Sequence, residues 1–62
     1  MANPTMSFAG LERTYDQLAQ AIDSVGEDKT AALLAKLAML LAHQLGDEQL
    51  VADAIVAAAA DL

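Results

Sequence analysis

Three groups of side chains in this 62-residue chain are of types that could take part in chemistry. The hydroxyl of Ser24, which follows Asp23, could carry a covalently attached group. The imidazole of His43 could act as a general acid or base near neutral pH. The chain has no cysteine, which excludes thiol nucleophiles, disulfides and thiolate metal sites. Carboxylates that could bind a cation lie near the C-terminus, at Asp47, Glu48, Asp53 and Asp61.

The segment Asp23-Ser24-Val25 is similar to the Asp-Ser-Leu motif of acyl carrier proteins, which are also small, acidic and helical. Carrier proteins present this serine at the start of a helix that continues after it. Here Gly26 follows closely, and the apolar spacing places Ser24 at the end of a helix. The sequence therefore predicts a solvated serine in a C-terminal turn.

His43 has no evident partner for acid–base work, which requires a cleft and a positioned second group. One heptad separates it from Lys36, so both lie on the least apolar side of the second helix. Three roles remain open for it: an exposed histidine near the negative end of the helix dipole, an interface hydrogen bond, and a ligand or catalytic duty. The sequence favours the first.

The C-terminal carboxylates do not follow the alternating ligand spacing of a calcium loop. Helix capping and solubility account for them, and a single histidine does not make a histidine metal cage. The chain also lacks a nucleophile–base pair and a phosphate-binding glycine loop. We therefore expect no catalytic residue, no cofactor, no metal site and no enzyme activity.

The elements that must position these residues begin with an amphipathic helix over residues 8–25. Ser7 is a possible N-cap, and Gly26 suits the left-handed residue that follows a helix. Apolar residues recur at intervals of three and four, as one face of a helix requires. They are Phe8, Leu11, Tyr15, Leu18, Ile22 and Val25.

A second helix is predicted over residues 29–45. Glu27 and Asp28 place negative charge at its start, which the helix dipole favours, and Asp28 or Thr30 is the expected cap. Gly46 ends this helix.

Asp47 caps a third, alanine-rich helix. The predicted fold is all-α, either a three-helix bundle or a helical hairpin plus a short third helix. We expect an irregular N-terminal lead, residues 1–7, followed by a single small helical domain, residues 8–62. The three helices are expected at approximately 8–25, 29–45 and 47–60.

The second helix is apolar nearly all the way round, since three polar side chains alone interrupt residues 31–45. With Leu34 and Leu41 at the core position of a heptad, its outer positions hold alanine and methionine where a surface helix normally carries charge. This second apolar face predicts a protein interface, with Lys36 and His43 at its rim. The predicted interface residues are Ala32, Ala35, Lys36, Met39, Leu40, Ala42 and His43.

Length and composition also point to association. A core of this size rarely supplies more than about 3–5 kcal/mol, so small domains usually need disulfides, a metal or a partner chain. The chain is 56% hydrophobic with a mean hydropathy of +0.37, which is high for a small monomer. The partner chain is the remaining choice, and folding on binding is an open alternative.

The net charge of −6 excludes two classes of partner. A nucleic-acid binder needs a basic stripe, and an anionic membrane surface would repel this chain. The apolar run of the second helix is shorter than the roughly 20 residues that span a bilayer. The first ten residues, MANPTMSFAG, do not form a secretory signal. We expect a cytoplasmic protein.

The segments YDQLAQAIDSVG and LLAKLAMLLAHQLGDEQLVADAI resemble a family of short bacterial proteins, domain of unknown function 2783. The shared features are a Tyr-led amphipathic helix, a leucine-rich helix of the form LxxLLA, a Gly-Asp corner and a short final helix. The resemblance runs from about Leu11 to Ala57, and the lead and the tail AAAADL lie outside it. It implies no established activity, but it implies genes beside those of flavin-dependent aromatic hydroxylases.

Two functions of different classes follow as expectations. The first is a non-catalytic accessory subunit that docks through the second helix onto a larger protein, such as a flavin-dependent aromatic monooxygenase, and stabilises or regulates it. The alternative is a self-associating homo-oligomeric helical bundle with a structural role, in which the alanine-rich face meets its own copy. The sequence does not separate them.

Overall fold

The computed structural model describes residues 5–60 and 62 and is built from helices. In chain order they are α1 (Phe8–Val25), the short 3₁₀ turn η1 (Glu27–Lys29), α2 (Thr30–Leu45) and α3 (Glu48–Ala59). No strand occurs in the described residues, so the all-α prediction is confirmed. Residues 5–7 precede α1 without regular structure, and the rest of the predicted lead lies outside the described residues.

Local signals in the sequence set both ends of α1. The Ser7 hydroxyl accepts a hydrogen bond from the Gly10 amide at 3.0 Å, which confirms the predicted N-cap. The helix ends at Gly26, whose φ of +87° is open to glycine and strained for other residues. The Gly26 amide still donates to the Ile22 carbonyl at 3.2 Å. Ser24 is therefore exposed in the last turn of α1, as predicted.

The first corner, residues 26–29, differs from the prediction. Neither Asp28 nor Thr30 caps α2, because the N-cap position is taken by Lys29, which makes no side-chain cap bond. The 3₁₀ turn supplies backbone partners instead, since the Lys29 amide donates to the Gly26 carbonyl at 3.2 Å. Thr30 is the first residue of α2, and its hydroxyl donates to the Gly26 carbonyl at 3.0 Å.

The second corner, residues 46–47, follows the sequence closely. Gly46 adopts the left-handed conformation, with φ 71° and ψ 17°, and its amide donates to the Ala42 carbonyl at 3.1 Å. The Asp47 carboxylate accepts from the amides of Gln49 and Leu50, both at 3.0 Å. Two adjacent residues thus end α2 and start α3.

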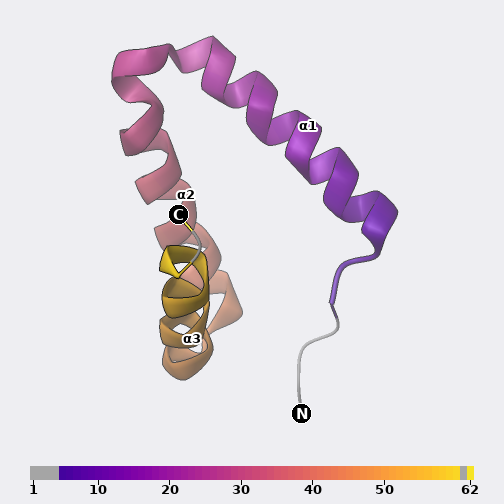
Figure 1. Cartoon of the computed structure of the whole chain (residues 1–62), viewed down its shortest axis with the longest axis vertical. Coiled ribbons are helices and arrows are strands. Elements are labelled where there is room, and N and C mark those ends of the chain that lie inside the picture. Colours follow the sequence, from indigo (N-terminus) through magenta and orange to yellow (C-terminus); the bar gives the residue numbers. More distant parts are fainter. Residues whose placement is uncertain (1–4, 61) are drawn as a thin grey trace.

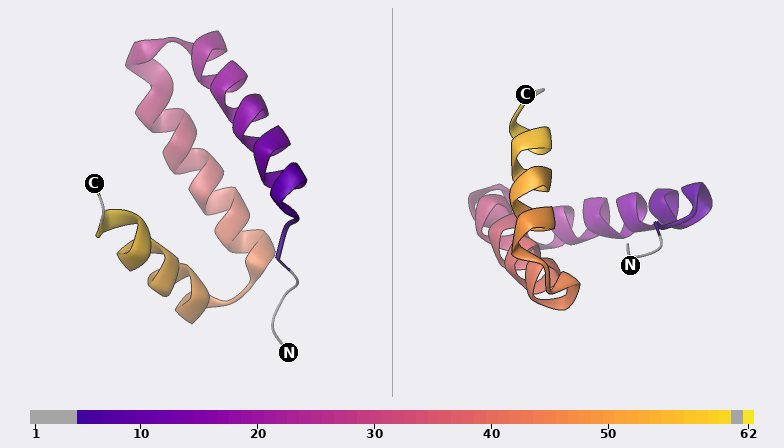
Figure 2. Two further views of the ribbon diagram at one scale, coloured as in Figure 1. Left: turned by 45° about the vertical axis from the view of Figure 1, so that its right-hand side comes forward. Right: turned by 90° about the horizontal axis from the view of Figure 1, so that it is seen from below.

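The three helices form an open zigzag with α2 in the middle (Figure 1). From the first corner α1 and α2 diverge, and α3 turns back along the other side of α2 (Figure 2). Within the described residues, α1 and α3 do not contact each other. Of the two predicted arrangements, the helical hairpin with a short third helix describes this geometry.

No described residue is buried in this arrangement. The radius of gyration is 13.0 Å, whereas a compact domain of this length would have about 10.6 Å. Leu34 and Leu41, predicted as core residues, are exposed because α1 meets α2 through Leu33 and Leu37 instead. The half-buried residues lie at the two helix contacts and the first corner, apart from Gly10 near the start of α1. They are Gly10, Leu18, Ala21, Ile22, Gly26, Thr30, Leu33, Leu37, Ala42 and Val51.

Candidate functional site

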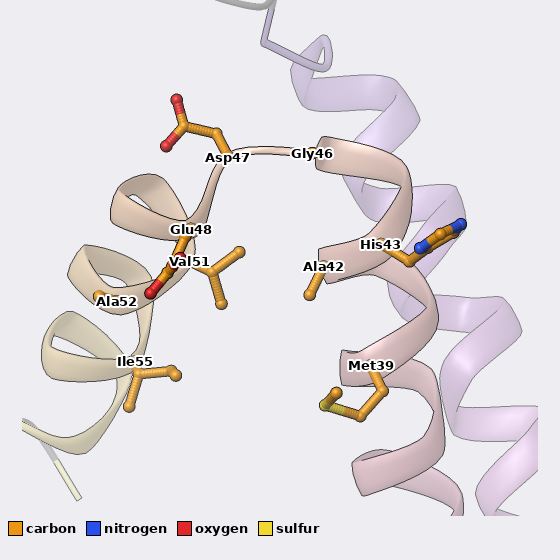
Figure 3. Close-up of a pocket in the computed structure, with 9 residues that line it drawn as sticks. All are labelled: Met39, Ala42, His43, Gly46, Asp47, Glu48, Val51, Ala52 and Ile55. Atoms are coloured by element: carbon orange, nitrogen blue, oxygen red, sulfur yellow. The ribbon is translucent and has the colours of Figure 1, made fainter.

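A hollow lies between α2 and α3 beside the second corner (Figure 3). We call it the corner groove, and its volume is about 580 Å³. The left-handed Gly46 and the Asp47 cap form the corner between the two helices, and both residues line this hollow. Its lining residues are Met39, Ala42, His43, Gly46, Asp47, Glu48, Val51, Ala52 and Ile55.

Apolar side chains form the floor of the corner groove, and polar ones lie at its edge. Ala42 and Met39 on α2 point toward α3, where Val51 and Ile55 point back toward them (Figure 3). The small Ala42 side chain is half-buried, and it lines the hollows on both sides of the contact between the two helices. The imidazole of His43 points away from α3 (Figure 3).

The predicted interface residues do not form one hollow. Met39, Ala42 and His43 line the corner groove. The other four predicted residues line neither this groove nor the two described below. Ala42 is partly covered by α3, so part of the second apolar face is occupied within the chain. Met39 remains the most exposed large hydrophobic side chain of α2, at 71% of its full exposure. The four residues outside the grooves, all exposed, are Ala32, Ala35, Lys36 and Leu40.

A second groove, which the sequence reasoning missed, lies on the other side of the α2–α3 contact. We call it the apolar groove; its volume is about 250 Å³, and no polar side chain lines it. The sequence does contain a signal for this groove, since apolar residues on α2 recur at intervals of four, three and four, at Leu34, Ala38, Leu41 and Leu45. The heptad pattern instead predicts a closed core along that stripe. The groove is lined by Ala38, Leu41, Ala42, Leu45, Val51, Ala54, Ile55 and Ala58.

A third groove separates α1 from α2. On α2 it is lined by Leu33 and Leu37, the residues that face α1. On α1 it is lined by one residue of the predicted apolar stripe, Leu18, and by residues that lie next to that stripe. The α1 residues that line it are Thr14, Gln17, Leu18 and Ala21.

Two of the carboxylates that were candidates for a cation site instead cap α3 or make a hydrogen bond on its surface. Asp47 caps α3, and the Asp53 carboxylate accepts a hydrogen bond from the Gln49 side-chain amide at 2.9 Å. In the part of the chain that the structure describes, no three His, Asp or Glu side chains gather where they could hold a metal ion. The fourth candidate carboxylate, Asp61, lies outside the described residues.

Length and hydropathy also bear on membranes. Among residues 5–60 and 62, no helix combines the length and the apolar character that crossing a bilayer requires.

Comparison with known proteins identifies a family for this chain. The model of a family described as "Protein of unknown function (DUF2783)" matches residues 2–60. The match extends past the predicted resemblance at both ends, and so includes most of the lead and of the alanine tail. No curated protein and no solved structure matches the chain. Because the family model covers nearly all of its 62 residues, the chain belongs to the DUF2783 family.

Proposed function

We propose that this chain is a non-catalytic, cytoplasmic interaction subunit that docks onto a larger protein and stabilises or regulates it. One observation carries the proposal: the chain is 56% hydrophobic, yet none of its described residues is buried. Apolar surface left in water opposes folding and promotes association, so another protein surface is needed to cover it. The first candidate partner is a flavin-dependent aromatic monooxygenase.

The corner groove has the composition of a docking site. Its apolar floor and polar edge match the usual anatomy of protein interfaces, which combine a hydrophobic centre with a polar rim. Met39 suits the centre because its flexible thioether fills irregular gaps. Docking would add a helix to the α2–α3 pair, or seat the pair in a groove of the partner.

Purification from the native host tests the proposal. The tagged chain is expressed in its own host, grown on an aromatic carbon source, and the proteins that accompany it in constant ratio are identified. Recovery of a yellow, flavin-containing protein at fixed stoichiometry is expected. Recovery of the chain with no other protein would contradict the docking role and remove the flavoprotein as partner.

A Met39→Asp variant should lose the partner while its helices remain. An unpaired carboxylate at the centre of a buried interface costs well over about 2 kcal/mol, so affinity should fall at least about 30-fold. The matched control is Val56→Asp, because Val56 is 69% exposed and lines none of the grooves. Binding is measured by titration calorimetry, and helix content by circular dichroism. If both variants bind as the parent chain does, the corner groove is not the docking site.

A further inference from the structure

We propose that a second copy of this chain covers the apolar groove, and that two copies form a symmetric dimer in which α1 of each packs into the apolar groove of the other. This goes beyond the docking role, because it uses the opposite side of the α2–α3 contact from the corner groove. The two grooves share only the residues of the contact itself, Ala42, Val51 and Ile55.

The argument begins with the sides of α2. Leu33 and Leu37 mark the side that faces α1, and Ala42 marks the side that faces α3. At 3.6 residues per turn these sides are nearly opposite, and two strips of α2 run between them. One strip carries Lys36, Met39 and His43. The other carries Leu34, Leu41 and Leu45, and contributes to the apolar groove.

The apolar stripe of α1 faces the same side of the molecule as the leucine strip of α2. On α1, the groove between α1 and α2 is lined mainly by residues beside the stripe, such as Thr14 and Gln17. The other residues of the stripe are rotated away from this groove, toward one side of the antiparallel pair formed by α1 and α2. Leu34 and Leu41 are rotated from Leu33 and Leu37 toward that same side.

One open side of the molecule therefore holds exposed apolar residues from all three helices. Seen from below, α1 and α3 leave α2 in different directions and leave a wedge open between them (Figure 2). Phe8 and Tyr15, at 76% and 73% exposure, stand at the α1 end. The residues on this side are Phe8, Leu11, Tyr15, Leu34, Leu41, Leu45, Leu50, Ala54 and Ala58.

Among the described residues named on this side, none is ionisable except Tyr15, although the chain as a whole has a net charge of −6. In a two-fold dimer the same patch is used by both copies, with α1 of one meeting the groove of the other, so carboxylates at both places would be brought together. Like charges brought together across an interface cost several kcal/mol in general, and a surface without charge avoids that cost for an acidic chain. This open side meets this condition.

Its shape is also self-complementary. Large side chains project from α1, at Phe8, Leu11 and Tyr15. On α3, the apolar groove is lined by the small side chains of Ala54 and Ala58, which leave room in it. Each copy thus holds both the projecting stripe and a groove that can receive it, as a two-fold interface requires.

The exposed area fits a dimer of this kind. The chain exposes 5661 Å², whereas a compact monomer of 6.4 kDa would expose about 3,800 Å². The excess is roughly 1,900 Å² per chain, to which the chain ends contribute. Obligate homodimers bury about 1,000–2,500 Å² on each subunit. A second copy can therefore cover the excess without any larger protein.

Sedimentation equilibrium of the isolated chain tests the proposal with a pair of adjacent variants. Leu41 lines the apolar groove and is 55% exposed, whereas Leu40 lines no groove and is 53% exposed. The parent chain and Leu40→Asp should have a mass near twice 6.4 kDa. Leu41→Asp should weaken the dimer at least about 30-fold. A monomeric parent chain, or equal masses for both variants, would overturn the proposal.

Cross-linking gives a second measurement that does not depend on a destabilising change. The natural chain has no cysteine, so Ala19→Cys and Ala54→Cys chains each carry a single thiol. Mixed and treated with a short bismaleimide, they should give a product linking α1 of one chain to α3 of the other. Ala32→Cys mixed with Ala54→Cys is the control, because Ala32 lies on the far strip of α2. The absence of a product joining α1 to α3, or as much product from the control, would refute the dimer.

Failure of this dimer and failure of the docking role give different results. Sedimentation and cross-linking use the purified chain alone and probe Leu41, whereas partner binding is probed at Met39. A chain that is monomeric but still binds a partner through Met39 would contradict the dimer and support the docking role. A dimer that binds no other protein would do the reverse.

Discussion

At the residue scale, the polar side chains of this protein serve the ends and surfaces of helices. The Ser7 hydroxyl and the Asp47 carboxylate accept from free amides at the starts of α1 and α3. Both were predictable, because an oxygen-bearing residue before an apolar run is a local signal that needs no knowledge of packing. The absence of a side-chain cap on α2 was not predictable, because the 3₁₀ turn supplies backbone hydrogen bonds in its place.

Asp47→Ala should lower the stability of the chain by about 0.5–2 kcal/mol, because two amide donors lose their acceptor. Asp53→Ala is the matched control, since it removes a single side-chain bond on the surface of the same helix, worth about 0.2–0.5 kcal/mol. Thermal unfolding followed by circular dichroism measures both. Equal shifts would mean that the cap does not determine where α3 begins.

At the element scale, the sequence predicted the helices better than their packing. The ends of α1 were predicted as observed, and those of α2 and α3 within one residue, because apolar spacing, caps and glycines act locally. The pairing of faces was wrong for Leu34 and Leu41. A helix that is apolar nearly all the way round gives several faces that a neighbour could use, and periodicity does not choose among them.

The same limit applies to the candidate site. Met39, Ala42 and His43 were predicted together and do lie in one groove. The apolar groove was missed because it exists only when α3 lies on the side of α2 opposite α1. That arrangement depends on the angle of the second corner, which a Gly-Asp pair does not specify by itself.

The two corner glycines should respond differently to asparagine. Gly46 is left-handed, a conformation that asparagine visits readily, so Gly46→Asn should cost less than about 1 kcal/mol. Gly26, with φ 87° and ψ 163°, lies in a region open almost solely to glycine, so Gly26→Asn should cost about 1–3 kcal/mol.

Space around the two glycines does not explain such a difference. An added Cβ would meet nothing within 4 Å at Gly46, and Asp28 Oδ1 at an ordinary 3.4 Å at Gly26. Urea unfolding of both variants gives the comparison. A Gly46 variant as unstable as the Gly26 variant would show that backbone conformation does not decide the cost of a side chain at the corners.

At the scale of the whole molecule, the chain has secondary structure without an interior. Its radius of gyration of 13.0 Å and its lack of buried residues in the described part follow from one cause, namely that α2 separates α1 from α3. A closed bundle would have brought the stripe of α1 against α3. The open form instead leaves most of that stripe exposed.

The thermal midpoint should therefore rise with protein concentration. A two-chain unit gains about 1.4 kcal/mol for each tenfold increase in concentration, whereas a monomer gains nothing. Midpoints measured by circular dichroism over two decades of concentration decide the matter. The Leu41→Asp variant should show a lower midpoint and a weaker dependence over the same range. A constant midpoint for the parent chain would contradict an interior shared between chains.

The contacts of each helix are limited to its neighbours along the chain, and this has a kinetic consequence. Chains rich in local contacts have low contact order and fold in microseconds to milliseconds. Each helix and corner of this protein can form without waiting for distant segments to meet. If the proposed dimer forms, the slow step is the encounter of two preformed zigzags. Refolding monitored by tyrosine fluorescence should then be second order, with a half-time that shortens as the chain is concentrated.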